Sequence, residues 1–465
     1  MNIKEMNVKV KAVLDPGFAP MAVAWRQFER EVAGRPSQRL GIAVERNQGL
    51  LESLTLDILR EGDDDAYNAA FVERLVKGML WIYGGFRLHI AGSRAMYEHI
   101  GAAYAPGGAR EFDRGMMTRI YERPFEVLFV ESAAGLPPPR RSASAVGRNL
   151  DGCRIGFDAG GSDRKVSAVI DGEAVFSEEV VWHPKLNADP AYHYQGILSA
   201  MREAAAHMPR VDAIGISSAG VYVDNKIMVA SLFLKVPEAD FDRYVKTMYL
   251  DAAREIGERI PVEVANDGDV TALAGAMDLD DANVLGIAMG TSEAGGYVDG
   301  QGSITGWLNE LAFVPIDANE SAMVDEWSGD HGCGVKYFSQ DAVIKLAPAA
   351  GIELDAALSP AEKLKVVQEL MERKDPRAAG IYDTIGAYFG YAIAYYARFY
   401  DIKHVLVMGR VTSGEGGVLL LERAREVLDT EFPELAARIR LSIPDEASRR
   451  VGQSITAASL PALRK

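Results

Sequence analysis

The sequence predicts an α/β protein with two similar halves around a cleft, preceded by an additional N-terminal region. Two observations predict this fold class. Apolar, strand-like runs end in glycine-rich turns at 158–162 and again at 290–296, and a third such run ends at Asn266-Asp267 between them. Helical patterns separate these runs, and strands that alternate with helices are typical of α/β folds that bind ligands in clefts.

The two glycine-rich turns have the composition of a phosphate cradle. The first follows the apolar run 153–157, and the second follows the run 284–289. Backbone N–H groups in a concave turn bind polyphosphates well, and glycine permits the close approach because it has no side chain. Asp158, in the first turn, adds a carboxylate that could hold Mg²⁺ through water beside the phosphates. Either turn alone is weak evidence, but together they predict a nucleotide clamp.

After residue 150 the expected strands and helices alternate. A tight hairpin turn is expected at Asp171-Gly172. Apolar residues recur at helical spacing over 197–208, 241–256 and 381–396. The expected strands are 155–157, 166–170, 174–181, 213–216, 262–265, 284–289, 296–298 and 404–408.

The first part of the chain has a different character. Three prolines at 137–139 cannot continue a helix or a sheet ladder, so a linker is expected at 132–150. Ahead of it, apolar residues at helical spacing over 71–80 precede Gly84-Gly85, and a mainly helical domain is expected at 1–131. Residues 1–150 hold 20 Lys and Arg against 18 Asp and Glu, so this region is nearly neutral.

Composition argues against several classes of protein. The formal net charge of −16 argues against nonspecific binding to nucleic acid or to an anionic membrane, so neither is expected as a partner. Cys153 and Cys333 are the only cysteines, which argues against a disulfide framework and favours a reducing compartment. The start of the chain lacks a signal-peptide pattern, and no uncharged apolar stretch approaches membrane-spanning length. We therefore expect a cytoplasmic protein.

Three segments, 156–162, 264–273 and 286–296, resemble in order and spacing the phosphate and sugar motifs of ROK-type sugar kinases, within the actin and hexokinase-like superfamily. The resemblance covers about 151–465 and implies two RNase H-like lobes around a nucleotide cleft. The implied boundaries are 151–265 for lobe I, with a C-terminal helix at about 446–465, and 266–445 for lobe II.

The resemblance implies an ATP-dependent carbohydrate kinase that uses Mg²⁺. Asp267 matches the family's general base, which takes the proton of the sugar hydroxyl, although Asn266 or Asp267 would also suit a helix N-cap. Glu310 matches a sugar-binding glutamate, with an exposed loop carboxylate as the alternative. The expected sugar contacts are Asn266, Glu310, Gln340 and Ser218, and the expected nucleotide contacts are Asp158, Gly160, Gly161, Ser162, Gly290, Thr291, Ser292 and Gly409.

The chain departs from the family pattern at several positions. Phe313 stands where many members have a zinc-binding histidine, and of three knuckle cysteines only Cys333 remains. One thiolate cannot complete a tetrahedral site, so no zinc is expected. Gln340 replaces a glutamate, which removes a charge and adds a donor. Asp163 follows the first turn where Thr-Lys is common, and Arg410 replaces a glycine of the adenosine loop.

The expected function is phosphorylation of a sugar or sugar-derivative hydroxyl by a homodimeric enzyme. Two alternatives stay open. A sugar-responsive ROK-type transcription regulator would use its N-terminal domain to bind DNA, but the near-neutral charge and the lack of a clear basic recognition helix count against it. An ATP-hydrolysing activator of the same superfamily that reduces a partner enzyme would need a cysteine-held iron–sulfur cluster, which two distant cysteines support poorly.

Overall fold

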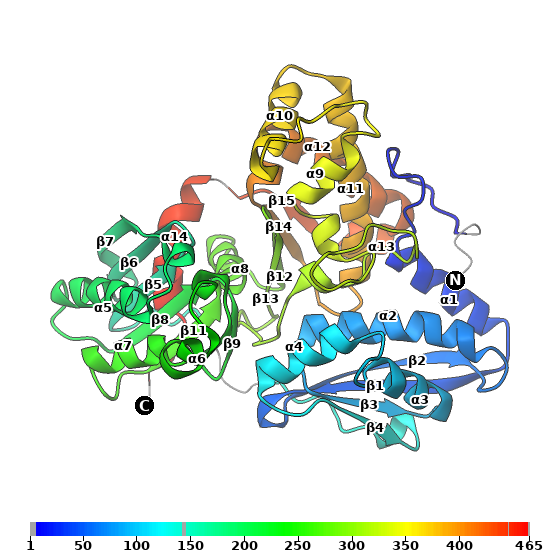
Figure 1. The fold of residues 1–465 in the computed structure, drawn as a ribbon, viewed down its shortest axis with the longest axis horizontal. Helices are drawn as coiled ribbons and strands as arrows, with labels where there is room; N and C mark the ends of the chain where they lie inside the picture. The colour runs from blue at the N-terminus through cyan, green and yellow to red at the C-terminus, as the bar shows by residue number, and fades with distance from the viewer. Residues whose placement is uncertain (1–5, 142–145, 445, 464–465) are drawn as a thin grey trace.

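The structure, a computed structural model, describes residues 6–141, 146–444 and 446–463. Figure 1 shows three bodies, each with its own β-sheet: an N-terminal region in blue and cyan, lobe I in green, and lobe II in yellow and orange. The sheet of lobe I and the sheet of lobe II each contain a pair of antiparallel strands joined by one of the two predicted glycine turns.

Lobe I contains a five-stranded sheet of order β11-β8-β5-β6-β7. The central strand β5 pairs antiparallel with β6 and parallel with β8, and β11 extends the parallel part. A short hairpin, β9 and β10, follows β8. The elements are β5 (Cys153–Ala159), β6 (Asp163–Ile170), β7 (Glu173–Val181), α5 (Pro190–Ala206), β8 (Ala213–Ser218), β9 (Val221–Val223), β10 (Lys226–Val229), α6 (Glu238–Asp240), α7 (Met248–Ile256) and β11 (Val262–Asn266).

The last helix, α14 (Glu446–Ala458), returns from lobe II to pack on the lobe I sheet, where the resemblance had placed the closing helix. Glycines on two neighbouring strands make this approach possible. A Cβ at Gly156 would lie 1.6 Å from the Ser454 carbonyl oxygen, and a Cβ at Gly215 would lie 1.6 Å from that of Ala457. The helix backbone therefore rests directly on strands β5 and β8.

Lobe II contains a four-stranded sheet of order β13-β12-β14-β15. Strand β12 pairs antiparallel with β13 and parallel with β14, and helix α8 packs on β12 and β13. The elements are α8 (Asp267–Asp278), β12 (Val284–Met289), β13 (Glu293–Val298), α9 (Gln340–Leu346), α10 (Pro360–Glu372), α11 (Pro376–Tyr396), β14 (His404–Met408), α12 (Glu415–Glu431), α13 (Pro433–Ala436) and β15 (Arg440–Ser442).

The N-terminal region is richer in helix than in strand, but the expectation of a mainly helical domain missed a four-stranded sheet of order β2-β1-β3-β4. The missed signal is the alternation of apolar and polar residues in β2, paired with the buried run in β1. The elements are α1 (Met21–Ala33), β1 (Ser37–Glu45), β2 (Leu51–Leu59), α2 (Asp65–Tyr83), β3 (Arg87–Ala91), α3 (Arg94–Ala103), α4 (Glu111–Tyr121) and β4 (Glu126–Val130).

One hydrophobic core joins the N-terminal region to lobe II. Trp25 of α1 packs edge-on against Tyr395 and Phe399 of lobe II, with ring centroids 6.1 and 5.9 Å apart, and Phe71 of α2 belongs to the same buried cluster. Part of the expected linker also packs: Leu136 covers Gly41 of β1. Residues 142–145 of that linker lie outside the described part of the chain. The N-terminal region is therefore built onto lobe II.

Among the described residues, no helix combines the length and the apolar character that a membrane span requires.

Candidate active site

A cavity of about 280 Å³ lies where lobe II meets the closing helix. Asp267 and Thr271 of α8 line it together with Gly409, which follows β14, and Gln453 of α14. We call it the Asp267 cavity. Gly409 has φ +98°, and a Cβ there would lie 2.3 Å from the carbonyl oxygen of Met289, directly before the second glycine turn. Only glycine fits this position without moving the backbone.

Asp267 is the first residue of α8, and Asn266 is the N-cap of that helix. The Asn266 Oδ1 accepts a hydrogen bond from the Gly268 N–H at 2.7 Å, and its Nδ2 donates to the Gly220 carbonyl at 2.7 Å. Asp267 Oδ1 also accepts from the Gly268 N–H, at 3.0 Å. The cap therefore belongs to Asn266, and the partly exposed Asp267 carboxylate is held at the cavity wall.

The environment of Asp267 favours a proton acceptor. Burial raises the pKa of Asp267, while the Gly268 N–H and the positive charge of Lys185 oppose that shift. A carboxylate with a raised pKa is a stronger base than an ordinary surface aspartate.

Asp158 is the second-last residue of strand β5, beside the first glycine turn, and is buried. Its Oδ1 accepts a hydrogen bond from the Ser217 hydroxyl at 2.7 Å, and the Lys165 ammonium lies 3.9 Å from its Oδ2. Burial raises the pKa of Asp158 to about 6, against the effect of those two neighbours. The negative charge of this buried carboxylate is only partly neutralised by its neighbours, so a nearby cation would stabilise it. A group that binds magnesium is expected to have this property.

Lys185 lies beside the candidate site, and no sequence pattern predicted its position there. It lies in a 3₁₀ turn after β7, and a Cβ at Gly161 would lie 3.1 Å from its Cε and 3.3 Å from its Nζ. The lysine therefore extends over the first glycine turn, and its charge reaches Asp267. Lys165, by contrast, is paired with Asp163 at 3.1 Å. An isolated, exposed lysine in a loop carries no pattern that links it to a distant turn.

The remaining predicted nucleotide contacts lie in the turns. Gly160 accepts a hydrogen bond from the Trp182 indole N–H at 2.8 Å, which fixes the first turn, and Ser162 is exposed. In the second turn the Gly290 N–H donates to the Ser292 carbonyl at 3.0 Å, and Thr291 is exposed. Both turns thus present exposed backbone.

Two further carboxyl groups, the partly buried Glu310 and the buried Glu293, have raised pKa values. Burial raises the pKa of Glu310 to about 7, and the charges of Asp267 and Asp269 add to that effect. Burial likewise raises the pKa of Glu293 to about 8, and its Oε2 has no hydrogen-bond partner in the described part of the chain. Glu293 was not among the predicted site residues, because its place in the glycine turn directed attention to the backbone.

The N-terminal region positions Glu310. The Glu310 N–H donates to the Trp81 carbonyl at 3.1 Å, and the Asn309 N–H donates to the Ile82 carbonyl at 3.0 Å. Both carbonyls lie in the last turn of α2, where the backbone carbonyl groups of a helix have no N–H partner within the helix. The loop that carries Glu310 therefore caps α2.

Two predicted sugar contacts are engaged inside the protein. Ser218 is fully buried, and its oxygen accepts a hydrogen bond from the Tyr249 hydroxyl at 2.8 Å. Gln340 begins α9, and its backbone N–H donates to the Gly290 carbonyl at 2.9 Å. Gln340 thus supports the second glycine turn through its backbone, and both sugar contacts stay predictions.

A family model described as the ROK family matches residues 154–455. The chain belongs to the ROK family. Similar solved structures include a ROK family transcriptional regulator, described as a homologue of the E. coli MLC protein, with 19% identity over 67% of this chain and 79% of that chain (TM-score 0.50). A ROK hexokinase from Thermus thermophilus has 19% identity over 65% of this chain and 97% of that chain (TM-score 0.49).

A ROK glucokinase from Streptomyces griseus, in complex with glucose and AMPPNP, has 21% identity over 67% of this chain and 99% of that chain (TM-score 0.45). Comparison with curated protein sequences gave no match. The fold is therefore the expected pair of actin and hexokinase-like lobes, with a further N-terminal region.

This ROK chain fills the place of the missing knuckle histidine with aromatic packing. The Phe313 ring lies 4.2 Å from the Trp81 ring of α2, measured between centroids, and Phe112 and Trp327 pack around it. Among the described residues, no three His, Cys, Asp or Glu side chains are arranged to hold a metal ion. The absence of zinc stays a prediction.

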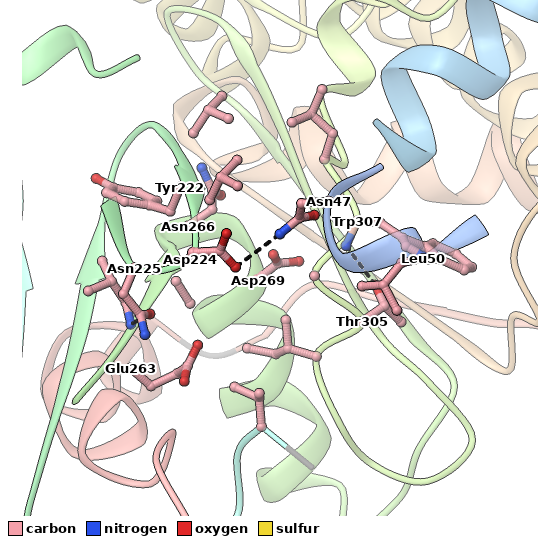
Figure 2. Close-up of a pocket in the computed structure, with 18 of the residues that line it drawn as sticks. Asn47, Leu50, Tyr222, Asp224, Asn225, Glu263, Asn266, Asp269, Thr305 and Trp307 are labelled. Carbon is pink, nitrogen blue, oxygen red and sulfur yellow. Dashed lines mark hydrogen bonds between the residues drawn. The ribbon is translucent and has the colours of Figure 1, made fainter. Parts of the chain in front are cut away.

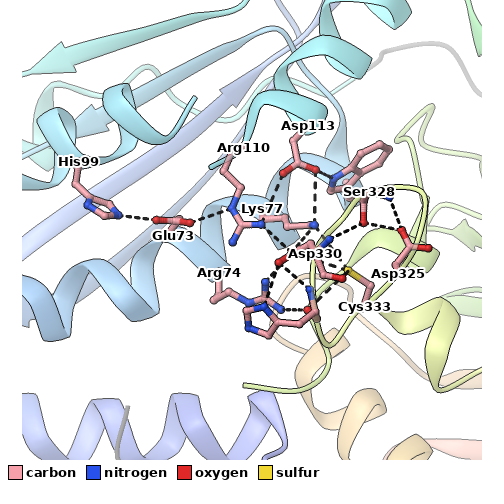
Figure 3. Close-up of polar contacts among 12 residues, drawn as sticks. Glu73, Arg74, Lys77, His99, Arg110, Asp113, Asp325, Ser328, Asp330 and Cys333 are labelled. Atoms are coloured by element: carbon pink, nitrogen blue, oxygen red, sulfur yellow. Dashed lines mark hydrogen bonds and ion pairs between the residues drawn. The ribbon is translucent and has the colours of Figure 1, made fainter. Parts of the chain in front are cut away.

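The loop around Cys333 is held by ion pairs to the N-terminal region instead (Figure 3). One oxygen of Asp330 contacts three cations: Lys77 at 2.5 Å, Arg74 at 2.6 Å and Arg110 at 2.7 Å. Lys77 also lies 3.7 Å from the Cys333 sulfur. Burial pushes the pKa of Asp330 upward, but the three cations outweigh it and hold the pKa well below its ordinary value.

Proposed function

We propose that this ROK protein transfers a phosphoryl group from ATP to a hydroxyl of a sugar or sugar derivative. The observation that carries the proposal is the position of Asp267. Its carboxylate lies at the first turn of a helix, is partly exposed, and lines a cavity between lobe II and the closing helix, together with Gly409 and Gln453.

In this mechanism the acceptor hydroxyl donates a hydrogen bond to the Asp267 carboxylate. The hydroxyl oxygen then forms a bond to the γ-phosphorus of ATP, the bond from that phosphorus to the bridging oxygen breaks, and ADP leaves with the electron pair. The hydroxyl proton passes to Asp267, which makes the oxygen a competent nucleophile at neutral pH. Glu310, held by α2, would accept hydrogen bonds from neighbouring hydroxyls.

The residues present fit Mg²⁺ and a triphosphate. The turns at 160–162 and 290–292 carry exposed residues, Gly161 and Ser162 in the first and Thr291 and Ser292 in the second, whose backbone N–H groups would bind phosphate. Gly409 keeps the cavity wall close to Met289. Asp158 would hold Mg²⁺ through water, and Mg²⁺ would neutralise charge on the phosphates as the bond breaks. Asp158 itself is oriented by the Ser217 hydroxyl.

Replacing Lys185 by Met is expected to raise the KM for ATP by about tenfold, because it removes a charge-assisted contact to phosphate worth about 1.5 kcal/mol or more. Lys185→Arg should restore much of the affinity, since the charge returns. Steady-state kinetics with varied ATP measures both. Lys235→Met, at an exposed lysine of the same lobe, is the control and should behave like the unaltered protein. An unchanged KM for ATP in Lys185→Met would contradict the role.

The pH dependence of the rate should reflect the raised pKa of Asp267. The base works only when deprotonated, so kcat/KM should fall as the pH decreases through that pKa, at values above the ordinary aspartate pKa of about 3.9. A profile that is flat from about pH 8 to about pH 4 would be inconsistent with Asp267 as the base.

The structure of the N-terminal region favours the hypothesis of an enzyme over that of a DNA-binding regulator. Its helices flank a four-stranded sheet, and it shares one core with lobe II rather than forming a separate helical unit. Release of ADP from ATP in the presence of hexoses, N-acetylhexosamines or inositols tests the proposal. Sugar-dependent release supports it, whereas specific retention of DNA fragments in a gel shift without sugar-dependent release would favour the regulator.

A further inference from the structure

A second cavity of about 280 Å³ lies where the N-terminal region, lobe I and lobe II meet (Figure 2). We call it the junction cavity. Asn266 and Asp269, which lie on either side of Asp267 in the sequence, both line it. Leu308, two residues before Glu310, lines it as well. The cavity is therefore adjacent to the candidate active site.

The N-terminal region supplies one wall of this cavity. The turn between β1 and β2 reaches lobe I, where the side-chain amides of Asn47 and Gln48 donate to Asp224 Oδ1 at 3.0 and 2.7 Å. On the lobe II side, the buried Arg46 guanidinium donates to the Gly306 carbonyl at 2.7 Å. Figure 2 shows Asn47 facing Asp224 across the cavity. The wall is thus anchored to both lobes.

The charged residues that line the junction cavity are all acidic. Asp224, Glu263 and Asp269 line it, and no lysine, arginine or histidine from the described part of the chain does so. Asp269 already accepts from the Tyr297 N–H at 3.0 Å and from the Asn309 amide at 2.9 Å, and Asp224 accepts from two amides. For Glu263, the Asn225 side chain favours the charged form.

A cavity of this kind suits a ligand that brings its own positive charge. Burial raises the pKa of Glu263 to about 7, the charge of Asp224 adds to the shift, and the Asn225 side chain opposes it. None of the described residues that line the cavity is a cation that would offset the negative charge. A ligand ammonium would supply that charge, and ligand hydroxyls would donate to the remaining carboxylate oxygens. An anionic ligand would meet only like charge.

We propose that the junction cavity holds the amino-bearing part of the acceptor, with Glu263 as the partner of its ammonium group, so that the substrate class is amino sugars or aminocyclitols. This inference rests on the proposed kinase function, because it places the acceptor hydroxyl beside Asp267.

Binding measured by calorimetry without ATP tests the inference. Glucosamine and 2-deoxystreptamine are the charged probes, and N-acetylglucosamine and myo-inositol are their uncharged counterparts. At least one charged probe is expected to bind about tenfold more tightly than its counterpart, as a charge-assisted hydrogen bond predicts. Glu263→Gln should abolish that preference, while Glu258→Gln, at an exposed position of lobe I, should leave it intact.

A second variant tests whether the N-terminal wall of the junction cavity contributes to binding. Replacing Asn47 and Gln48 together by Ala removes both donors to Asp224 and should weaken binding of the charged probe, with the circular dichroism of the protein unchanged. Equal affinity for charged and uncharged probes, no binding of either charged probe, or a preference that survives Glu263→Gln would each overturn the inference. Amine binding without phosphoryl transfer would instead refute the kinase proposal, since calorimetry does not depend on ATP.

Discussion

Asp267→Asn is expected to lower kcat by about 10² to 10⁴, the usual range for loss of a general base. Asparagine keeps the size and the hydrogen bond to the helix start but cannot accept the hydroxyl proton. Affinity for ATP should change little, because the glycine turns and Asp158 would hold the phosphates. A coupled assay of ADP release gives kcat, and fluorescence titration with a nucleotide analogue gives the affinity.

The control for this variant lies on the same helix. Asp278 is exposed at the end of α8, and Asp278→Asn should retain full activity. If Asp267→Asn keeps its turnover, the assignment of the base is wrong. If it loses nucleotide binding as well, Asp267 belongs to the phosphate site instead.

Asp330→Asn is expected to reduce the free energy of unfolding by about 3 to 5 kcal/mol, the typical cost of breaking a buried ion pair from one side. The reason is that Arg74, Lys77 and Arg110 would remain buried around a neutral amide. Because this cluster joins the N-terminal region to the Cys333 loop, the midpoint of unfolding should shift to a clearly lower urea concentration. Asp57→Asn, which breaks an exposed pair with Arg39, should cost about 0 to 1 kcal/mol.

The same cluster predicts the direction of acid sensitivity. The pKa of Asp330 is lower in the folded protein than in the unfolded chain, so its stabilisation is fully present above the unfolded value of about 3.9 and is lost as the pH falls below it. The difference in the free energy of unfolding between neutral and acidic pH should therefore be smaller in Asp330→Asn than in the unaltered protein. An unchanged unfolding midpoint at neutral pH would show that the cluster contributes nothing to stability.

Local signals predicted the architecture of residues 151–465. Asp171-Gly172 is the turn between β6 and β7, and the runs at 153–157 and 284–289 became β5 and β12, each ending at its glycine turn. The local pattern predicted a carboxylate between the two turns, and the resemblance to the family assigned Asp267 as the base. The structure shows that Asn266 provides the helix cap, and the role of Asp267 as the base stays a prediction.

The features that sequence reasoning missed depend on contacts between distant segments. Lys185 lies over Gly161 only because the chain after β7 returns to the first glycine turn. Asp330 gains its importance from three cations more than 200 positions earlier, and the acidic junction cavity forms only where three bodies meet. The N-terminal sheet was missed because the long apolar helix α2 dominated the pattern of that region.

Direct detection of the phosphorylated product tests the central claim. The protein is incubated with ATP, Mg²⁺ and a panel of neutral and amino sugars, and the sugars are analysed by mass spectrometry. The account predicts a sugar monophosphate formed in equal amount to ADP with the unaltered protein, and about 10² to 10⁴ times less product in the same time with Asp267→Asn. A sugar that binds without ever gaining phosphate, or product formed equally by Asp267→Asn, would contradict it.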